Sequence, residues 1–497
     1  MYSCPECSIG TRGRYTALMR RYIILGILLI GAGSLAHLAP KTYEVRRTSD
    51  GFEPPELSIR PGDTVRFFGS GNDFWPASDA HPSHGFYRQF DPRTAIAGDD
   101  SWAFVFERPG PWTYHDHLTP RARGVIRVSG PIPPLSECLS FYGTSTAQAF
   151  CWGRTLIDTI AHDGLEGAFR DVETMRKDTA FESQCHDVMH LIGAAAYAEF
   201  LSDETHVYTH PMTSSCGFGY YHGLVETMLV DRGPGDLGLA REYCDALGQA
   251  QSLPTDTARR RAQDACYHGI GHALFDTIDA SSWGDTDRMV RIVESQCERL
   301  SDDTRIRELC MSGVYNSLAN AYSSHSYGLI PPPLADSYCA TQRDGYRERC
   351  YVELTAGMMR RERILYEEAL THIRSLPAGV QTHALRAYLD DEFRHYMTDP
   401  TPERVSARCA DLTQNREHMD CIAGALRAFS YRAAATPETL APTLYGFCAL
   451  ESESSFRVAC VAKARAHLST DIPSSAAEAL CVSYFDEEAC RTPSGDL

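Results

Sequence analysis

Cysteine spacing limits the fold of this chain more than any other feature. All but two of its 18 cysteines lie after residue 137, where one cysteine repeatedly ends an apolar-periodic stretch and another opens the next. An even number of cysteines at short, regular spacings predicts a disulfide framework made in an oxidising compartment. The expected pairs are local: Cys138–Cys151, Cys185–Cys216, Cys244–Cys266, Cys297–Cys310, Cys339–Cys350, Cys409–Cys421, Cys448–Cys460 and Cys481–Cys490.

The same segment, 138–497, has the apolar period of helices, for example in "DRMVRIVESQCERL" and "RERILYEEALTHI". Glycine often follows a cysteine by three residues (Gly219, Gly269, Gly313 and Gly424), which would let a neighbouring backbone approach closely. We predict an all-α solenoid of helical hairpins, each held by a disulfide that contributes about 2–4 kcal/mol.

The segment 41–130 has a different pattern, in which apolar and polar residues alternate between Pro-Gly and Gly-Asp turns. "YEVRRT", "ELSIRPGDTVRFFG", "SWAFVFERPG" and "RGVIRVSG" are typical of short strands. We predict a β-sandwich here. The proline-rich stretch 131–137 then predicts a linker between the two regions.

Residues 1–40 are a predicted leader. Arg20 and Arg21 precede an apolar run of about fifteen residues, shorter than the roughly twenty that span a bilayer. A cleaved signal peptide and an uncleaved membrane anchor both stay open, and translation starting at Met19 would begin a well-formed signal peptide. Each alternative predicts that the rest of the chain is extracytoplasmic, either secreted or attached to the membrane through this helix.

The charge of the chain and the motifs that it lacks argue against two classes of function, nucleic-acid binding and hydrolysis. The formal net charge is −18 and is spread along the chain, which argues against nucleic acid as a partner. The sequence has no Gly-x-Ser-x-Gly, Walker, dinucleotide-binding or His-Glu-x-x-His motif, so hydrolase functions receive little support.

Two histidines stand two residues apart in "GPWTYHDHLTP", residues 110–120, a stretch predicted to be a strand. Alternate strand residues point to the same face, so His115 and His117 are expected to lie side by side. The preceding loop adds His81 and His84. These four histidines predict a metal site, with Asp116 on the other face as an outer contact. The alternative is a sandwich whose histidines merely line a loop.

The segment from residue 42 to residue 130 resembles the cupredoxin family, through "FEPPELSIRPGDTVRFF" and "FERPGPWTYHDHLTPRARGVIRV". Blue-copper members carry cysteine, histidine and methionine ahead of a strand similar to "GVIRV". Asp116, Thr119 and Ala122 stand near those places here, so a thiolate copper site is not available.

A better local similarity is to the first domain of multicopper oxidases. It rests on Gly110–His117 and, in part, on "HPSH" at residues 81–84. The resemblance implies a mononuclear, histidine-ligated site for which copper is the expected metal and zinc the alternative.

The helical region has a second histidine set, in "CHDVMH", "CGFGYYHGLVE" and "CYHGIGHALF". Members of a pair four residues apart share one helix face, and stacked repeats would bring equivalent positions together. Either a second metal site or simple packing of histidines across glycine contacts fits this pattern. The residues are His186, His190, His222, Glu226, His268 and His272.

These observations favour an extracytoplasmic copper-binding protein engaged in metal handling or electron transfer. Its helical solenoid would bind a protein partner or a second metal. Two alternatives remain open: a metal-dependent enzyme with its active site at the helical histidines, and a surface interaction scaffold whose histidines are structural.

Overall fold

The structure is a computed structural model. Residues 1–38 of the predicted leader, His81, His84 and residues 132–137 of the linker lie outside the described residues. No helix among the described residues is long and apolar enough to cross a membrane. The described residues are 39–79, 87, 89–131, 138, 145–176, 181, 185–203, 207–324, 326–362, 364–397, 399–432 and 437–491.

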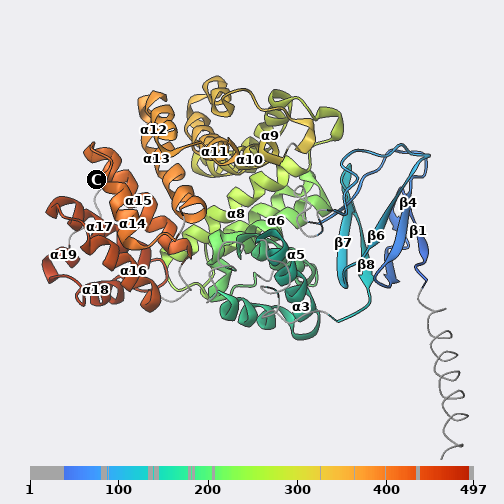
Figure 1. The fold of residues 1–497 in the computed structure, drawn as a ribbon, viewed down its shortest axis with the longest axis horizontal. Coiled ribbons are helices and arrows are strands. Elements are labelled where there is room, and N and C mark those ends of the chain that lie inside the picture. The colour runs from blue at the N-terminus through green and yellow to red at the C-terminus, as the bar shows by residue number, and fades with distance from the viewer. Residues whose placement is uncertain are drawn as a thin grey trace, which may run out of the picture.

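The N-terminal region consists of two four-stranded sheets with mixed strand directions (Figure 1). One sheet has the order β2-β1-β4-β6 and the other β3-β8-β7-β5. The pairs β1–β4 and β3–β8 are parallel, and the other neighbours are antiparallel. The strands are β1 (Thr42–Thr48), β2 (Gly51–Glu53), β3 (Glu56–Ile59), β4 (Asp63–Phe68), β5 (Pro76–Ser78), β6 (Ser101–Phe106), β7 (Gly110–Asp116) and β8 (Thr119–Val128).

An aromatic core holds this region together. Phe67 on β4 and Tyr114 on β7 are fully buried, and both pack against Phe90 from the long connection between β5 and β6. The alternating burial along β4 explains the alternating sequence pattern, because one face of each strand turns to this core.

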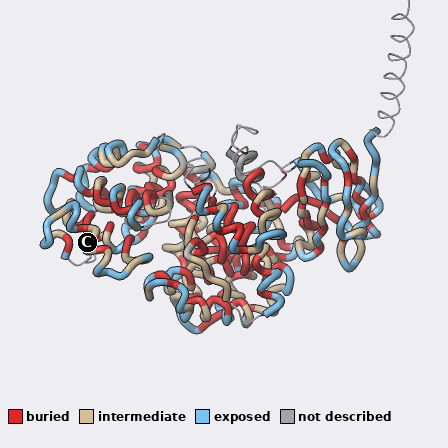
Figure 2. Tube along the Cα trace, turned by 90° about the horizontal axis from the view of Figure 1, so that it is seen from below, coloured by how far each residue is buried: buried red, intermediate tan, exposed pale blue. Residues whose placement is uncertain are grey.

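The rest of the chain is helical, and its longer helices stack in chain order, α5–α6–α8–α10–α11–α13–α15–α17. Figure 2 shows buried residues running along the inside of this stack. The helices are α3 (Ser145–Met175), α5 (Cys185–Phe200), α6 (Gly219–Arg232), α7 (Leu237–Leu247), α8 (Asp256–Asp276), α9 (Thr286–Leu300), α10 (Thr304–Ser324), α11 (Asp344–Glu362), α12 (Tyr366–Ser375), α13 (Ala378–Asp391), α14 (Pro402–Ala410), α15 (Asn415–Arg432), α16 (Pro437–Ala449), α17 (Ser454–Leu468), α18 (Ser474–Cys481) and α19 (Glu487–Arg491).

Within the described residues, the helical region contains eight disulfides, and they are the eight pairs expected from local spacing. The paired cysteines are 9 to 31 residues apart in sequence. All sixteen are buried, so each bridge lies within the core. The helical expectation needs one correction: "RERILYEEALTHI" is not one helix, because α11 ends at Glu362 and α12 begins at Tyr366.

Glycines let neighbouring helices touch, as predicted. A Cβ added at Gly223 would lie 2.0 Å from the carbonyl oxygen of His190, and one at Gly313 would lie 2.0 Å from that of His268. A Cβ at Gly269 would lie 3.0 Å from the Cα of His222. The backbones of α5, α6, α8 and α10 therefore pack closer than a side chain at these positions would permit.

The stack curves so that its later helices reach its earlier ones. Tyr431 at the end of α15 donates a hydrogen bond of 3.4 Å to the carbonyl oxygen of Cys216. Thr255, just before α8, donates one of 2.6 Å to the carbonyl oxygen of Thr470, just after α17. Chain far away in sequence thus contacts the segments that directly precede α6 and α8.

Candidate metal centre

Five imidazoles from α5, α6 and α8 form one continuous cluster. His222 on α6 lies at its centre, with ring centroids 5.5 and 5.4 Å from His186 and His190 on α5. On its other side, His268 and His272 on α8 have centroids 5.3 and 5.5 Å away. The structure therefore brings together all five histidines that the helical pattern had singled out.

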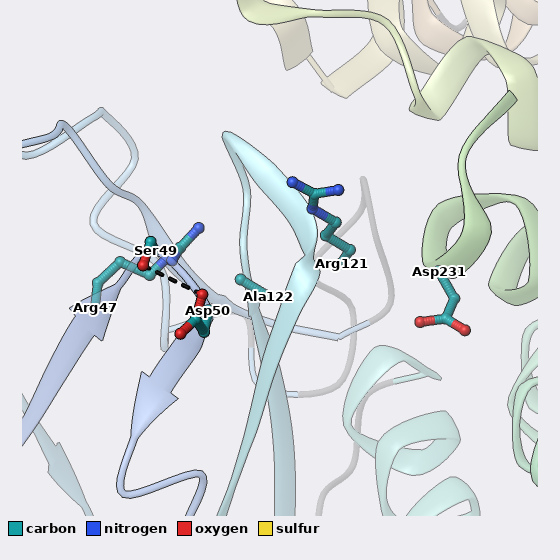
Figure 3. Close-up of a pocket in the computed structure, with 6 residues that line it drawn as sticks. All are labelled: Arg47, Ser49, Asp50, Arg121, Ala122 and Asp231. Atoms are coloured by element: carbon teal, nitrogen blue, oxygen red, sulfur yellow. Dashed lines mark hydrogen bonds between the residues drawn. The ribbon is translucent and has the colours of Figure 1, made fainter. Parts of the chain in front are cut away.

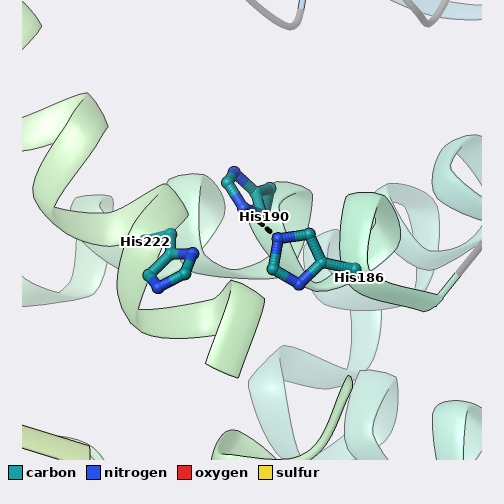
Figure 4. A group of neighbouring side chains, drawn as sticks. All are labelled: His186, His190 and His222. Atoms are coloured by element: carbon teal, nitrogen blue, oxygen red, sulfur yellow. Dashed lines mark hydrogen bonds between the residues drawn. The ribbon is translucent and has the colours of Figure 1, made fainter. Parts of the chain in front are cut away.

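The side of the cluster towards α5 has the geometry of a metal site (Figure 4). One ring nitrogen of each of His186, His190 and His222 can be chosen so that all three lie within 4.8 Å of one another. The Nε2 atoms of His186 and His190 face each other at 3.1 Å.

The Nδ1 atoms of this facing pair already have partners. His186 Nδ1 lies 2.7 Å from the carbonyl oxygen of Cys216, which can only accept, so this nitrogen carries the proton. His190 Nδ1 lies 3.1 Å from a carboxylate oxygen of Glu226. Outer partners of this kind hold metal-binding histidines with Nε2 directed at the ion.

The pKa values of the two histidines are shifted in opposite directions. Burial, and then the neighbouring His190, lower the pKa of His186 to about 3, so its Nε2 carries a lone pair at neutral pH. Burial acts to lower the pKa of His190. The charge of Glu226 and its hydrogen bond outweigh burial, so the pKa is raised. A proton on His190 Nε2 can therefore bridge the two rings, and a metal ion would replace that proton.

His222 has no such partner. It is buried, with 6% of its surface exposed, and within the described part of the chain neither ring nitrogen has a hydrogen-bond partner. Burial, followed by the charges of the surrounding histidines, lowers its pKa well below the usual value. A buried polar group without a partner is costly, and a coordinated metal would satisfy it.

The side towards α8 continues the pattern with residues that sequence reasoning missed. His272 Nδ1 lies 2.8 Å from the hydroxyl of Ser317. One turn beyond His272, Asp276 is buried and accepts a hydrogen bond of 2.8 Å from the hydroxyl of Tyr327. The four-residue step from His272 to Asp276 was visible in the sequence, whereas Tyr327 comes from a short 3-10 helix, Ser326–Gly328, that is distant in sequence.

In the β region, His115 is fully buried near the end of β7. Its Nδ1 lies 2.7 Å from Asp79, a carboxylate that the sequence analysis had not singled out. Burial opposes ionisation of Asp79, but Arg123 and His115 outweigh it and hold the pKa of this carboxyl well below its usual range.

The placement of His117 differs from the expectation. A register shift occurs between His115 and Asp116, and β7 ends at Asp116, so His117 lies in the turn beyond the strand. Its ring is still near, with its centroid 6.0 Å from that of His115. His117 also packs against helical-region side chains, with centroids 5.3 Å from Trp283 and 5.8 Å from Tyr327.

Asp116 holds the turn around these histidines. It accepts a hydrogen bond of 2.7 Å from Arg47 and others of 2.9 and 3.2 Å from the backbone amides of Trp75 and Leu118. Its partners are thus an arginine and the backbone. The outer metal contact expected of Asp116 stays untested, since His81 and His84 lie outside the described residues.

A polar cleft lies where the β region meets α6 (Figure 3). Arg121 on β8 and Asp231 near the end of α6 face it from opposite sides. Its lining residues are Arg47, Ser49, Asp50, Arg121, Ala122 and Asp231, a set separate from both histidine groups.

Comparison with known proteins gives little beyond this geometry. No family model and no curated protein matches the chain. A copper-containing nitrite reductase from Thermus scotoductus shares 21% identity over 19% of this chain and 23% of its own, with a TM-score of 0.15. A pseudoazurin from Sinorhizobium meliltoi shares 18% identity over 25% of this chain and 98% of its own, with a TM-score of 0.16. These weak neighbours are cupredoxins, and likenesses at such TM-scores carry no argument about function.

Proposed function

We propose that this protein is an extracytoplasmic copper-binding protein whose principal metal centre is formed by His186, His190 and His222. One observation carries the proposal: the Nε2 atoms of His186 and His190 face each other at 3.1 Å while their Nδ1 atoms have other partners. Beside them, His222 is buried and has two ring nitrogens without partners among the described residues.

The spacing fits a single ion. Two nitrogens 3.1 Å apart, each at the usual metal–nitrogen distance of about 2.0–2.1 Å, subtend an angle of about 100° at the metal. Outer hydrogen bonds fix both rings before any metal arrives. The site therefore needs little rearrangement to bind.

Imidazole ligands suit copper and zinc, and copper binds such sites more tightly. The sixteen cysteines of this region are paired in disulfides and are not available as soft ligands. We therefore propose copper, with zinc as the competitor. Bound copper would supply a redox-active or transferable ion, and the chain would hold it through three imidazole rings.

The hydrolytic alternative has less support. A zinc hydrolase would need a base near a metal-bound water. Glu226, the carboxylate one turn beyond His222, is already held by His190 at 3.1 Å and orients that ring. Metal handling or electron transfer thus fits better than hydrolysis.

The β region is proposed to carry a second copper site at His115 and His117, as its cupredoxin resemblance implies. Support comes from Asp79, which holds the ring of His115 as outer carboxylates hold metal-binding histidines. His117 lies against Tyr327, which donates to Asp276, so side-chain contacts lead from the β region to α8, the helix that carries His268 and His272. Binding of a protein partner by the helical region and of the membrane by the N-terminal helix stay predictions.

Metal titration of the full chain tests the proposal. After chelation, Cu(II) is added with a competing chelator of known affinity to the parent and to H186Q/H190Q. We expect the double variant to bind at least one ion fewer. His162→Gln, on a 73%-exposed side chain of α3, is the matched control and should bind like the parent. Unchanged binding by H186Q/H190Q would overturn the proposal.

A further inference from the structure

The histidine cluster continues beyond the proposed copper site. Beyond His222 lies a second pair, His268 and His272, whose ring centroids are 4.8 Å apart. The first pair, His186 and His190, has a matching separation of 4.7 Å. Each pair stands four residues apart on one helix, and α6 lies between the two helices.

We propose that this cluster holds two metal ions bridged by the ring of His222. The first of these ions is the one in the proposed function, on which this inference rests. One ion binds His186, His190 and one nitrogen of His222. The second ion binds the other nitrogen of His222 together with His268 and His272. Each ion then has three imidazole ligands, and one further position stays open on each.

The central ring carries the argument. A histidine that serves one metal commonly holds a hydrogen bond through its other nitrogen. His186 and His190 show this arrangement, with Cys216 and Glu226 as partners. His222 breaks the rule, because it is buried and neither nitrogen is hydrogen-bonded within the described part of the chain.

The position of His222 allows a bridge. Its centroid lies between 5.3 and 5.5 Å from all four neighbouring rings, so it is shared evenly between the two pairs. Close helix contacts fix it there. A Cβ at Gly223 would meet the carbonyl oxygen of His190 at 2.0 Å, and one at Gly269 would meet Cδ2 of His222 at 3.2 Å.

The α8 side also has outer partners like those on the α5 side. Ser317 lies 2.8 Å from Nδ1 of His272 and leaves its Nε2 for a metal, as Glu226 does for His190. Two divalent ions bring four positive charges. Glu226, one turn beyond His222, offers negative charge close by.

Coordination through both nitrogens requires the ring of His222 to give up its N–H proton to solvent. Each nitrogen then donates one lone pair to one ion. Cu(II) is the probe that reports such a bridge, because two Cu(II) ions sharing an imidazole ring couple their unpaired electrons. Coupling lowers the electron paramagnetic resonance signal per bound copper at low temperature.

The experiment compares four full-length proteins, saturated with Cu(II) and freed of excess metal: the parent, H186Q/H190Q, H268Q/H272Q and H222N. Bound copper is measured by elemental analysis and the signal by double integration. Copper held in the β region contributes equally to all four, so differences between them report on the cluster. Near-ultraviolet circular dichroism checks that each variant keeps its packing.

We expect each double variant to bind one ion fewer than the parent and to give full signal per copper, whereas the parent gives less. H222N should lose the coupling. If H268Q/H272Q binds as many ions as the parent with the same signal, the second ion is refuted while the first site stands. If H186Q/H190Q is also unchanged, both proposals fall. Two bound ions with full signal in the parent would refute the bridge.

Discussion

The first half of the helical region runs from α3 to α10 and the second half from α11 to α19. Both halves consist of stacked helices with disulfides, but the side chains at their helix contacts differ. The position six residues after a cysteine is His222 on α6 and His272 on α8, but Arg427 on α15. In the second half, Arg427 lies 3.1 Å from Asp390 of α13, and Arg386 of α13 lies 2.7 Å from Asp420 of α15. Ion pairs therefore join α13 and α15.

The helix contacts of the first half are made mainly by imidazoles, with one carboxylate, Glu226 on α6, paired to His190 on α5. Five imidazoles meet there, and all of them become cations on protonation. The protein supplies both partners of each contact in the second half, whereas in the first half an external cation would complete the set. The difference suggests that the later repeats stabilise the array while the earlier repeats carry the chemistry.

Two variants, one in each half, test this difference, and they should give the largest effects on copper affinity and on stability. His222→Ala should weaken Cu(II) binding at the cluster by roughly 100-fold or more, because it removes a ligand, and should change the stability of the metal-free protein little. Arg386→Ala leaves buried Asp420 without its arginine and should cost about 2 kcal/mol of stability without changing copper affinity. Competition titration and urea unfolding measure the two quantities; a swapped result would contradict the comparison.

Loss of an outer partner should have a smaller effect. Glu226→Gln removes the charge that orients His190 and should weaken copper binding about 10-fold or somewhat more. Glu166→Gln is the control, since this 63%-exposed carboxylate serves Tyr208 on the surface. Equal copper affinities for the two variants, measured by competition titration, would show that Glu226 does not support the site.

Alanine substitutions at three glycines test how closely the helices pack. Gly223→Ala forces a Cβ to within 2.0 Å of a carbonyl oxygen and should destabilise the protein by about 1–3 kcal/mol. At Gly424 in the second half the nearest atom is 3.0 Å away, so the cost should be smaller. At Gly238 on α7 no described atom lies within 4 Å, and alanine there should stabilise by about 0.5–1 kcal/mol. Thermal unfolding of the three variants in any other order would contradict this account.

Two histidines, His418 and His186, should contribute to stability with opposite dependence on pH. In the second half, hydrogen bonding to Glu451 raises the pKa of His418 above its unfolded value, so its contribution is present below about pH 6.5 and is lost as pH rises through the raised pKa. His186 has a folded-state pKa of about 3, so the metal-free protein loses stability as pH falls from about 6.5 towards 3.

Glutamine variants of the two histidines can detect these small contributions to the free energy of unfolding. His418→Gln should destabilise the metal-free protein more at pH 6 than at pH 8. His186→Gln should do the reverse and relieve part of the loss at pH 5. Urea unfolding at each pH provides the free energies, and parallel pH profiles for the two variants would contradict the contrast between His418 and His186.

Local rules allowed much of the fold to be predicted from sequence. The eight disulfides follow from spacing because each closes a loop between neighbouring helices. The convergence of the five histidines follows from equivalent positions on stacked repeats. By contrast, the break between α11 and α12 does not interrupt the apolar period, so the sequence pattern did not show it.

The features that were missed depend on contacts between distant residues. Asp79 reaches His115 across 36 residues, and Tyr327 reaches Asp276 across 51. The turn that carries His117 beyond β7 depends on a register shift that strand alternation cannot reveal. Sequence periodicity places residues on faces, but it does not say which distant side chain meets them.

The most direct test of the central claim is a crystal structure of the full chain after loading with Cu(II), with anomalous differences collected at the copper edge. We predict a peak about 2.0–2.1 Å from Nε2 of His186, Nε2 of His190 and one ring nitrogen of His222. Anomalous density confined to the β region, with the helical histidines arranged as in the metal-free protein, would contradict the account.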